Sequence, residues 1–222
     1  MSAGKNVGDF YSEYSVALEQ SYERNGIDST GLYRYIKKIM DFLIALIGLV
    51  LCLPALIIFM IVIKLETPGP AFFLQERMGL DGRCFKVIKL RSMGIDAEKN
   101  GAQWAAKNDP RVTKIGEFIR KTRIDEIPQL INVLKGEMSI IGPRPERPVF
   151  TAQFNEEIPG FVNRLLVKPG LTGWAQVNGG YEITPKEKLE LDLYYIRELS
   201  LWLDLKIIFM TVIVVLTGEG AR

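Results

Sequence analysis

The sequence predicts a mostly helical α+β protein that is attached to a membrane. Three observations support this fold class. A run of 22 residues without a charge, Phe42–Ile63, is long enough for a membrane segment. Helix start and stop signals recur through the rest of the chain. One short segment, residues 83–91, is rich enough in Phe, Val and Ile to form a strand.

Composition excludes several classes of protein. The 222 residues are 48% apolar and 24% charged, which rules out wholesale disorder. The net charge of +2 shows no basic excess of the kind that a nucleic-acid interface needs, so we expect no nucleic-acid partner. There is no histidine and there are only two cysteines, which excludes histidine-based triads, histidine-containing zinc sites and disulfide frameworks. Catalysis would therefore depend on Asp, Glu, Lys, Ser or Tyr.

The chain divides into three expected parts. Residues 1–31 form a polar, acidic leader to which we assign no chemistry. Residues 32–66 form the membrane segment, and residues 67–222 form the part that carries the candidate site.

Both flanks of the apolar run are basic. Residues 31–41 have a net charge of +2 and residues 64–91 of +3, so the positive-inside rule places both on the cytoplasmic side. Pro54 lies near the middle of the run, where proline removes an intrahelical hydrogen bond and bends a helix. A helix-break-helix that enters one leaflet and returns satisfies both facts. A proline-kinked helix that crosses the bilayer is the common alternative, and these residues alone leave both open.

The first elements after the membrane segment follow from local signals. Thr67–Pro70 is a turn that stops any helix. The expected strand 83–91 carries Lys89 and Arg91. Residues 96–107 look helical, and residues 114–122 suit a short amphipathic helix with Thr113 as its N-cap.

Residues 123–136 predict a helix over about 126–135. Pro128 is tolerated only in a first turn, and Gly136 is typical of the position just after a helix end. Asp125 would then lie at or beside the N-cap, where the helix dipole keeps a carboxylate ionised.

Two helices are expected at the C-terminal end. Thr184–Glu187 is a capping box with proline at the first helical position, which predicts a helix to about Glu198. Leu199–Leu216 contains Trp202 and a ten-residue apolar run that is too short to cross a bilayer. This stretch predicts an amphipathic helix in the membrane interface.

Asp125 and Glu126 are the first candidate site. An isolated Asp-Glu pair at a helix start is more often an N-cap followed by a first-turn acid. The alternative is a nucleophile with a metal-binding neighbour, because Mg²⁺ is commonly held by one or two carboxylates plus substrate phosphates.

Several cations are candidates for binding phosphate. Pro143 and Pro145 restrict the backbone of Arg144, and a stiffened guanidinium suits phosphate oxygens, although a solvated arginine in a surface loop is the alternative. The further candidates are Lys89, Arg91, Arg120 and Arg147. Arg147 follows Arg144 by three residues, whereas Lys89, Arg91 and Arg120 would each alone usually be solvated or contact a lipid headgroup. Together with the acidic pair, they indicate phosphate chemistry on an amphiphilic substrate.

In these motifs the sequence resembles the bacterial sugar transferases, that is, the monotopic phosphoglycosyl transferases. The resemblance covers roughly residues 34–220. Its blocks, in family order, are KKIMDFLIALIGLVLCLPAL, TPGPAFFLQERMGLDGRCFKVIKLRSM, RKTRIDEIPQLINVLKGEMSIIGPRPE, KPGLTGWAQVNG and LDLYYIRELSLWLDLKIIF.

The resemblance implies a reaction. A sugar 1-phosphate would pass from a UDP-sugar to polyprenyl (undecaprenyl) phosphate, giving a polyprenyl-diphosphate sugar and UMP, as the first membrane step of glycoconjugate or polysaccharide assembly. Asp125 would be the nucleophile that forms a covalent aspartyl phosphosugar, and Glu126 its partner in handling Mg²⁺ and substrate. Arg120 and the segment Pro143–Pro145 would bind phosphate.

The resemblance also implies a place in the cell. The family fold is a mostly helical α+β domain facing the cytosol at the bacterial inner membrane, on a re-entrant helix, which favours the re-entrant alternative for residues 32–66. Many members have Ser-Pro at the membrane break, whereas this chain has Leu53 and Pro54, and leucine cannot hydrogen-bond the broken backbone. The sequence names neither the sugar nor the oligomeric state. A non-catalytic membrane adaptor and a metal-dependent lipid phosphatase are the competing functions.

Overall fold

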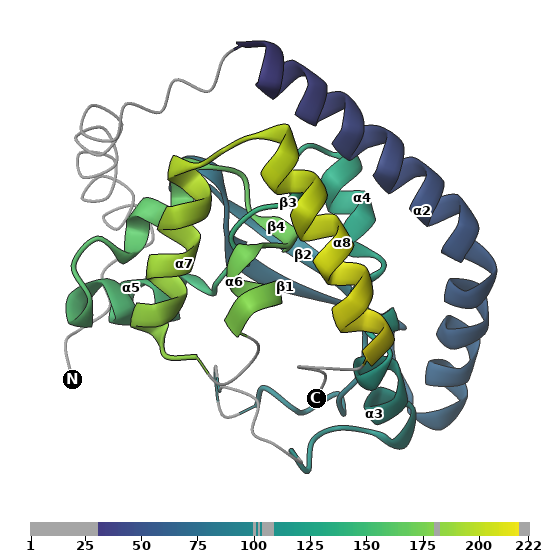
Figure 1. The fold of residues 1–222 in the computed structure, drawn as a ribbon. Coiled ribbons are helices and arrows are strands. Elements are labelled where there is room, and N and C mark those ends of the chain that lie inside the picture. The colour runs from purple at the N-terminus through teal and green to yellow at the C-terminus, as the bar shows by residue number, and fades with distance from the viewer. Residues whose placement is uncertain (1–30, 100, 102, 104–108, 180–182, 218–222) are drawn as a thin grey trace.

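The computed structural model describes residues 31–217 apart from residues 100, 102, 104–108 and 180–182 (Figure 1). The predicted leader lies outside the described residues except for Gly31. The fold is mostly helical, as predicted, and it contains two small sheets. The elements, in chain order, are α2 (Gly31–Glu66), β1 (Phe72–Met78), η1 (Leu80–Gly82), β2 (Cys84–Leu90), α3 (Lys114–Lys121), η2 (Ile124–Glu126), α4 (Gln129–Leu134), β3 (Ser139–Ile141), α5 (Pro148–Glu157), η3 (Phe161–Leu166), β4 (Gly170–Thr172), α6 (Trp174–Gly179), α7 (Pro185–Arg197) and α8 (Leu201–Thr217).

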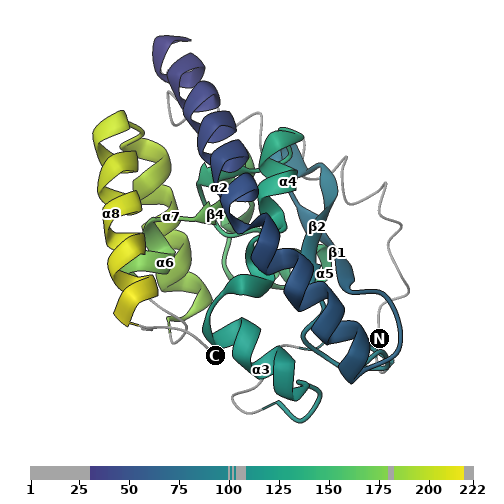
Figure 2. The same ribbon diagram turned by 90° about the vertical axis from the view of Figure 1, so that its right-hand side faces the viewer.

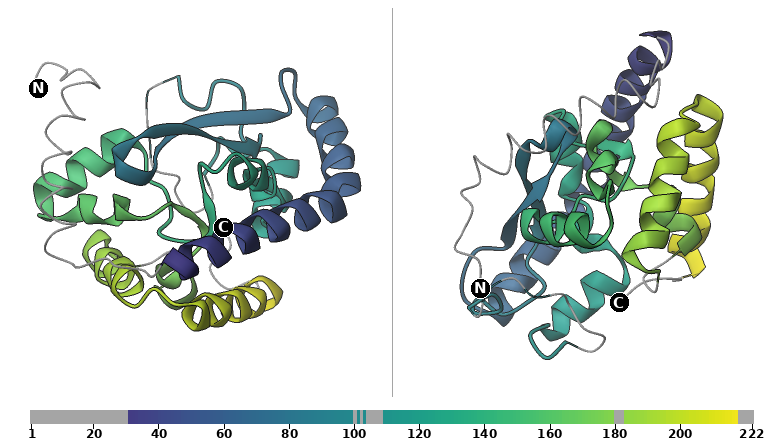
Figure 3. Two further views of the ribbon diagram at one scale, coloured as in Figure 1. Left: turned by 90° about the horizontal axis from the view of Figure 1, so that it is seen from above. Right: turned by 90° about the vertical axis from the view of Figure 1, so that its left-hand side faces the viewer.

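α2 is one continuous helix with Pro54 inside it. It is strongly bent, so its two arms run in different directions (Figure 1, Figure 3). Among the described residues it is the only helix that is long and apolar enough to cross a membrane, and only 11% of its most apolar stretch is buried. The core helix of a soluble protein would be largely buried, so this exposed apolar surface fits contact with lipid. A bend is what a proline inside a helix is expected to cause, but α2 is not interrupted, so the helix-break-helix and its return through one leaflet stay predictions.

One face of α2 packs along the rest of the fold (Figure 2). Ala45 is buried in a cluster with Leu130 of α4. Farther along, Leu56 and Ile63 are buried in a second cluster that includes Ile119 of α3. The apolar segment therefore lies against the polar part of the chain at several points and is not a free tether.

The strand predicted over residues 83–91 is confirmed as β2. It forms an antiparallel hairpin with β1, in which Phe72 lies opposite Leu90 and Met78 opposite Cys84. β1 itself was not predicted. The hairpin and the α7–α8 pair lie on opposite sides of the molecule, with α4 between them (Figure 2, Figure 3).

The second sheet is the short parallel pair of β3 and β4. Glycine is required where these segments meet. A Cβ atom at Gly142 would lie 2.4 Å from the carbonyl oxygen of Lys168, and one at Gly170 would lie 2.1 Å from the backbone nitrogen of Gly142. The glycines therefore allow the segment after β3 to approach β4 backbone to backbone.

Two of the predicted helix starts are confirmed in detail. The Thr113 side chain accepts a hydrogen bond from the Gly116 N–H and caps α3. Thr184 and Glu187 form the reciprocal capping box of α7, with Pro185 at the first position.

The helix predicted over residues 96–107 is wrong for the residues that the structure describes. Residues 95–99 form turns, in which N–H groups donate to the carbonyl three residues earlier, as from Ala97 to Gly94 and from Lys99 to Asp96. Gly101 has a φ of +87°, which a continuing helix does not allow. Most of residues 100–108 lie outside the described part of the chain.

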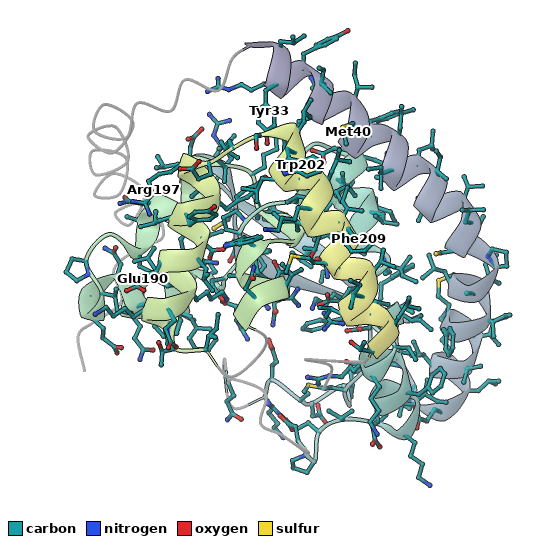
Figure 4. The ribbon with its side chains drawn as sticks, in the orientation of Figure 1. Tyr33, Met40, Glu190, Arg197, Trp202 and Phe209 are labelled. Atoms are coloured by element: carbon teal, nitrogen blue, oxygen red, sulfur yellow. The ribbon has the colours of Figure 1, made fainter. Side chains whose placement is uncertain are left out.

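α8 covers the predicted interfacial stretch. Its exposed surface is apolar, and Trp202 and Phe209 are exposed on it by 78% and 68% (Figure 4). Leu203, Asp204 and Ile207 form its buried face. An exposed apolar face of this kind agrees with an interfacial helix, and its contact with lipid stays a prediction.

Candidate active site

A cavity of about 760 Å³ lies between the β1–β2 hairpin, η2, the loop after β3 and the start of α7. This volume is in the range of small-molecule sites. Nine basic and three acidic side chains line it, so it attracts anionic ligands. The basic residues are Arg77, Lys89, Arg91, Arg111, Arg120, Arg123, Arg144, Arg147 and Lys188. All five predicted phosphate-binding residues are among them, and Asp125 lines the same cavity.

Asp125 and Glu126 lie in the 3₁₀ turn η2, not in the predicted helix over 126–135. That prediction is wrong at its start, because α4 begins only at Gln129 with Pro128 as its N-cap. The N–H groups of Glu126 and Ile127 donate to carbonyls three residues back, and Pro128 has no N–H. The predicted helix end is confirmed, since Gly136 has a φ of +77°.

η2 is preceded by a residue in the left-handed region. Arg123 has a φ of 58°, a backbone conformation that residues other than glycine rarely adopt. It follows Thr122, the C-cap of α3, and turns the chain into the acidic pair. Strained residues of this kind cluster at functional sites.

Two cations hold the side chain of Glu126. The Lys89 Nζ atom is 2.7 Å from Glu126 Oε1, and Arg144 donates from both terminal nitrogens to the two carboxylate oxygens. Burial alone would raise the pKa of Glu126, but Arg144 and Lys89 outweigh it and hold that pKa well below its usual range. Glu126 is therefore a carboxylate fixed in place by β2 and by the loop after β3.

The Asp125 carboxylate forms no hydrogen bond or ion pair with other described residues. It is only 8% exposed. Burial raises its pKa, and the charge of Glu126 adds to the rise, whereas Lys89, Arg120 and Arg144 oppose it. The helix dipole that was predicted to keep this carboxylate ionised is therefore not the main influence on it. Its pKa is set by burial and Glu126 on one side and by three cations on the other. Arg120, in the last turn of α3, forms no ion pair in the described part of the chain and is available to an anion.

Two predicted residues have other partners. The buried guanidinium of Arg91 donates to the carbonyls of Pro68 and Thr67 at 2.5 and 2.8 Å, so it fixes the end of α2. Arg147 pairs with Glu98 at 2.8 Å. Both residues line the cavity, but their guanidinium groups donate hydrogen bonds to these partners and not to Glu126.

Sequence reasoning missed a second charged group on the cavity wall. Glu146 is buried and pairs with Arg77 of β1 and Lys188 of α7. Burial lowers the pKa of Arg77 to about 10. Glu146 follows the Pro-Arg-Pro motif directly, which is a local signal, but nothing local points to its two partners.

The acidic pair fits a divalent cation only in part. Among the described residues, no group of three or more His, Cys, Asp or Glu side chains gathers to hold a metal. Mg²⁺ needs only one or two carboxylates when substrate phosphates and water complete its shell. The uncommitted oxygens of Asp125, with Glu126 beside them, fit such a shared site.

The comparisons with known proteins agree on one family. A family model described as bacterial sugar transferase matches residues 32–218. An Aeromonas hydrophila UDP-N-acetylgalactosamine-undecaprenyl-phosphate N-acetylgalactosaminephosphotransferase is 50% identical over 194 residues, or 86% of this chain. A proposed undecaprenyl-phosphate N-acetylgalactosaminyl 1-phosphate transferase of Bacillus subtilis is 59% identical over 165 residues, or 74% of this chain.

An Escherichia coli UDP-glucose:undecaprenyl-phosphate glucose-1-phosphate transferase is 44% identical over 212 residues, or 90% of this chain. The matched region is 46% of the Aeromonas and Escherichia relatives and 90% of the Bacillus relative. This chain therefore spans about half the length of two of these proteins and nearly all of the third.

Proposed function

The chain belongs to the bacterial sugar transferase family, and from this premise we propose that it transfers a sugar 1-phosphate from a UDP-sugar to undecaprenyl phosphate. One observation carries the proposal. Asp125 is an uncommitted carboxylate in a basic cavity, beside a Glu126 that Lys89 and Arg144 hold in place. This arrangement suits a nucleophile that meets an anionic phosphorus centre.

The first step is attack by an Asp125 carboxylate oxygen on the β-phosphorus of the UDP-sugar. A P–O bond forms to the carboxylate, and the bond from that phosphorus to the bridging diphosphate oxygen breaks. UMP leaves with the electron pair, and the sugar phosphate stays on Asp125 as an acyl phosphate. A carboxylate nucleophile divides one difficult displacement into two easier ones.

In the second step, a phosphate oxygen of undecaprenyl phosphate attacks the same phosphorus. The bond from phosphorus to Asp125 breaks and returns the electron pair to the carboxylate. The product is undecaprenyl-diphosphate sugar, and the enzyme is regenerated. The anionic donor and the anionic acceptor thus react in turn at the same carboxylate. The main requirement is fixed positive charge that stabilises the phosphate groups in both steps.

This chain's cations meet that requirement. Arg144 and Lys89 both contact Glu126. The charge of Arg120, in α3, favours the ionised form of Asp125. Their charge is positioned before the substrate arrives and needs no reorganisation during the reaction. Mg²⁺ on Asp125, Glu126 and substrate phosphates would add positive charge beside the transferring group.

We propose an N-acetylated hexosamine as the sugar. Support comes from the Aeromonas and Bacillus relatives, whose names specify N-acetylgalactosamine and whose identities of 50% and 59% exceed the 44% of the glucose-specific Escherichia relative. We also propose that the chain lies in the inner membrane on a re-entrant α2, with the cavity facing the cytoplasm. The exposed apolar surface of α2 and the basic residues on both sides of it support this orientation.

The test is UMP release by the purified full chain. We expect release from UDP-N-acetylgalactosamine with undecaprenyl phosphate and Mg²⁺, less from UDP-glucose, and none with EDTA or with Asp125→Asn. Release of inorganic phosphate from the lipid alone would indicate a lipid phosphatase. An intact protein that binds membranes but turns over no donor would indicate an adaptor.

A further inference from the structure

The loop that carries Arg144 is fixed through its backbone. Its four successive carbonyl oxygens, from residues 143 to 146, all accept hydrogen bonds of 2.8–3.0 Å. The donors, in the same order, are Gly170 N–H, Arg164 Nη2, Arg77 Nη1 and Met78 N–H. Since Pro143 and Pro145 have no N–H to donate, these carbonyls are the main backbone groups that can fix the loop.

The donor to Arg144 is itself held in a buried ion pair. Arg164 of η3 is 4% exposed, and its Nη2 donates to the Arg144 carbonyl oxygen at 2.8 Å. Its Nε donates to the Oδ2 of Asp192, on α7, at 2.6 Å. The guanidinium also lies 4.8 Å from the centre of the Phe161 ring. Asp192 is 1% exposed, so the pair is removed from water.

Such a pair is a costly way to stabilise a fold. The desolvation of two charges offsets most of their attraction, so apolar residues of similar volume would stabilise as well or better. A guanidinium offers what apolar residues cannot, which is a rigid fork of donors with fixed directions. Here one branch of the fork meets Asp192 and the other meets the backbone of Arg144.

We infer that Arg164, oriented by Asp192, is a positioning residue that sets the place of the Arg144 guanidinium in the active site. The inference rests on the proposed function, in which Arg144 faces the substrate phosphates. Neither Arg164 nor Asp192 lines the cavity, so both act through Arg144 and not on the substrate.

The lysine variant tests the fork. Arg164→Lys keeps the positive charge beside Asp192, but a single ammonium cannot reproduce both directed contacts. We expect kcat/KM for UMP release to fall about 10- to 100-fold, because small misplacements of a positioning group are this costly. Asp192→Asn keeps the shape, loses the charge that orients Arg164, and should have a smaller effect of the same kind.

A double-mutant cycle distinguishes positioning from general damage. In an Arg144→Ala background, Arg164→Lys and Asp192→Asn should lower kcat/KM no further than about twofold. The matched control is Val162→Ala, a buried apolar residue of the same element η3. It should lower the unfolding temperature, and any effect on kcat/KM should be equal in both backgrounds.

Calorimetric affinity for UDP with Mg²⁺ gives a second readout of the same cycle. Equal effects of Arg164→Lys and Asp192→Asn with and without Arg144 would overturn the inference, even if the wild type releases UMP as proposed. Wild-type protein that binds UDP but releases no UMP would contradict the proposed function, while the cycle on UDP affinity would still decide the inference. Wild-type protein that does neither would overturn both.

Discussion

Lys37 and Asp204 form a 3.1 Å ion pair across 167 residues of chain. The pair joins the first turns of α2 to the start of α8. Tyr33 and Tyr195 donate to the same carboxylate at 3.0 and 2.9 Å, and Asp204 is only 1% exposed. Figure 4 shows Tyr33 and Trp202 near the same end of the molecule. The two helices with the most exposed apolar surface are thus fastened together by a buried polar cluster.

Removing the shared acceptor should destabilise the protein strongly. Asp204→Ala removes the carboxylate that Lys37 and the Tyr33 hydroxyl contact. The Tyr195 hydroxyl loses the same acceptor but keeps its hydrogen bond to the Ile141 carbonyl oxygen at 3.2 Å. Breaking one side of a buried ion pair costs about 3–5 kcal/mol. Denaturant unfolding in detergent should show a loss of this size, with little change for Lys38→Met, an exposed neighbour. Equal losses in both variants would mean that the cluster adds nothing specific.

Glu146 should make stability depend on acid pH. Burial would raise its pKa, but Lys188, Arg164 and Arg77 outweigh burial and lower it. A depressed folded-state pKa adds stability that is present above the unfolded value, about 4.3, and is lost as the pH falls through the folded-state value. Wild type should therefore be more stable than Glu146→Gln at pH 7.

The difference between the two proteins should shrink as the pH falls below about 4. Thermal unfolding in detergent at pH 7, 5, 4 and 3 measures it. Glu190→Gln is the control, because Glu190 is exposed on the outer side of α7 (Figure 4). A pH-independent difference for Glu146→Gln would show that its carboxylate charge is not what stabilises the site.

Local signals predicted the elements whose determinants lie within a few residues. The N-cap at Thr113, the capping box at Thr184 and the helix end at Gly136 were all found in this way, because each depends on contacts three or four residues apart. Local signals also misplaced Asp125, which was expected at the start of the 126–135 helix but lies in η2. The i→i−3 hydrogen bonds around Pro128 and the left-handed Arg123 that shape η2 leave no periodic pattern to detect.

The partners of the site charges were beyond local reasoning. Arg91 looked like other cations of its strand, but its carbonyl partners lie just after the end of α2, 23 and 24 residues away. Arg77 and Arg164 were not singled out, because an arginine in sequence gives no sign of the buried carboxylate or carbonyl it meets. The same motifs did give Asp125, Glu126 and Arg144, whose chemistry is visible in their immediate neighbours.

Labelling should establish the topology of α2. In a background with Cys52 and Cys84 replaced by alanine, cysteines at Lys38 and Pro68 should both react from the cytoplasmic side only. Both positions are exposed at opposite ends of the helix. Gly69 is unsuitable, because its φ is +112° and a Cβ atom there would lie 2.5 Å from the Arg91 guanidinium.

Pro54→Leu is the matched variant for this experiment. It restores the missing N–H donor and removes the ring clash, so it should favour a straight helix. If the two cysteines are labelled from opposite sides in this variant but not in the parent, Pro54 is what makes α2 return to the cytoplasmic side. Opposite labelling in the parent would establish a helix that crosses the membrane.

Arg144→Lys should impair turnover although it keeps the charge. Arg144 uses both terminal nitrogens on the two oxygens of Glu126, and a lysine ammonium has no such planar fork. We expect kcat/KM for UMP release to fall about tenfold or more, as for the loss of a charge-assisted hydrogen bond worth 1.5–3 kcal/mol. Arg197→Lys, exposed on α7, should leave the rate unchanged. A wild-type rate in Arg144→Lys would show that a point charge is sufficient.

The covalent step makes the sharpest prediction. Asp125 is the one carboxylate of the pair without a fixed partner in the described structure, whereas Glu126 is held by Lys89 and Arg144. Burial raises the pKa of Asp125, which makes its ionised form more basic and hence a stronger nucleophile than an ordinary aspartate. With UDP-sugar and Mg²⁺ but no lipid acceptor, we therefore expect a sugar phosphate to accumulate on Asp125.

Intact-mass spectrometry should show this adduct, and adding undecaprenyl phosphate should discharge it as lipid product forms. Asp125→Asn should abolish both adduct and turnover, because the amide is a poor nucleophile of similar shape. Glu126→Gln should slow turnover yet leave Asp125 able to react, since the side chain at position 126 loses its charge but keeps its position. Kinetics should be ping-pong, with UMP released before the acceptor binds. A ternary-complex pattern, or substantial activity in Asp125→Asn, would assign the attack to the acceptor phosphate and leave Asp125 with an electrostatic role.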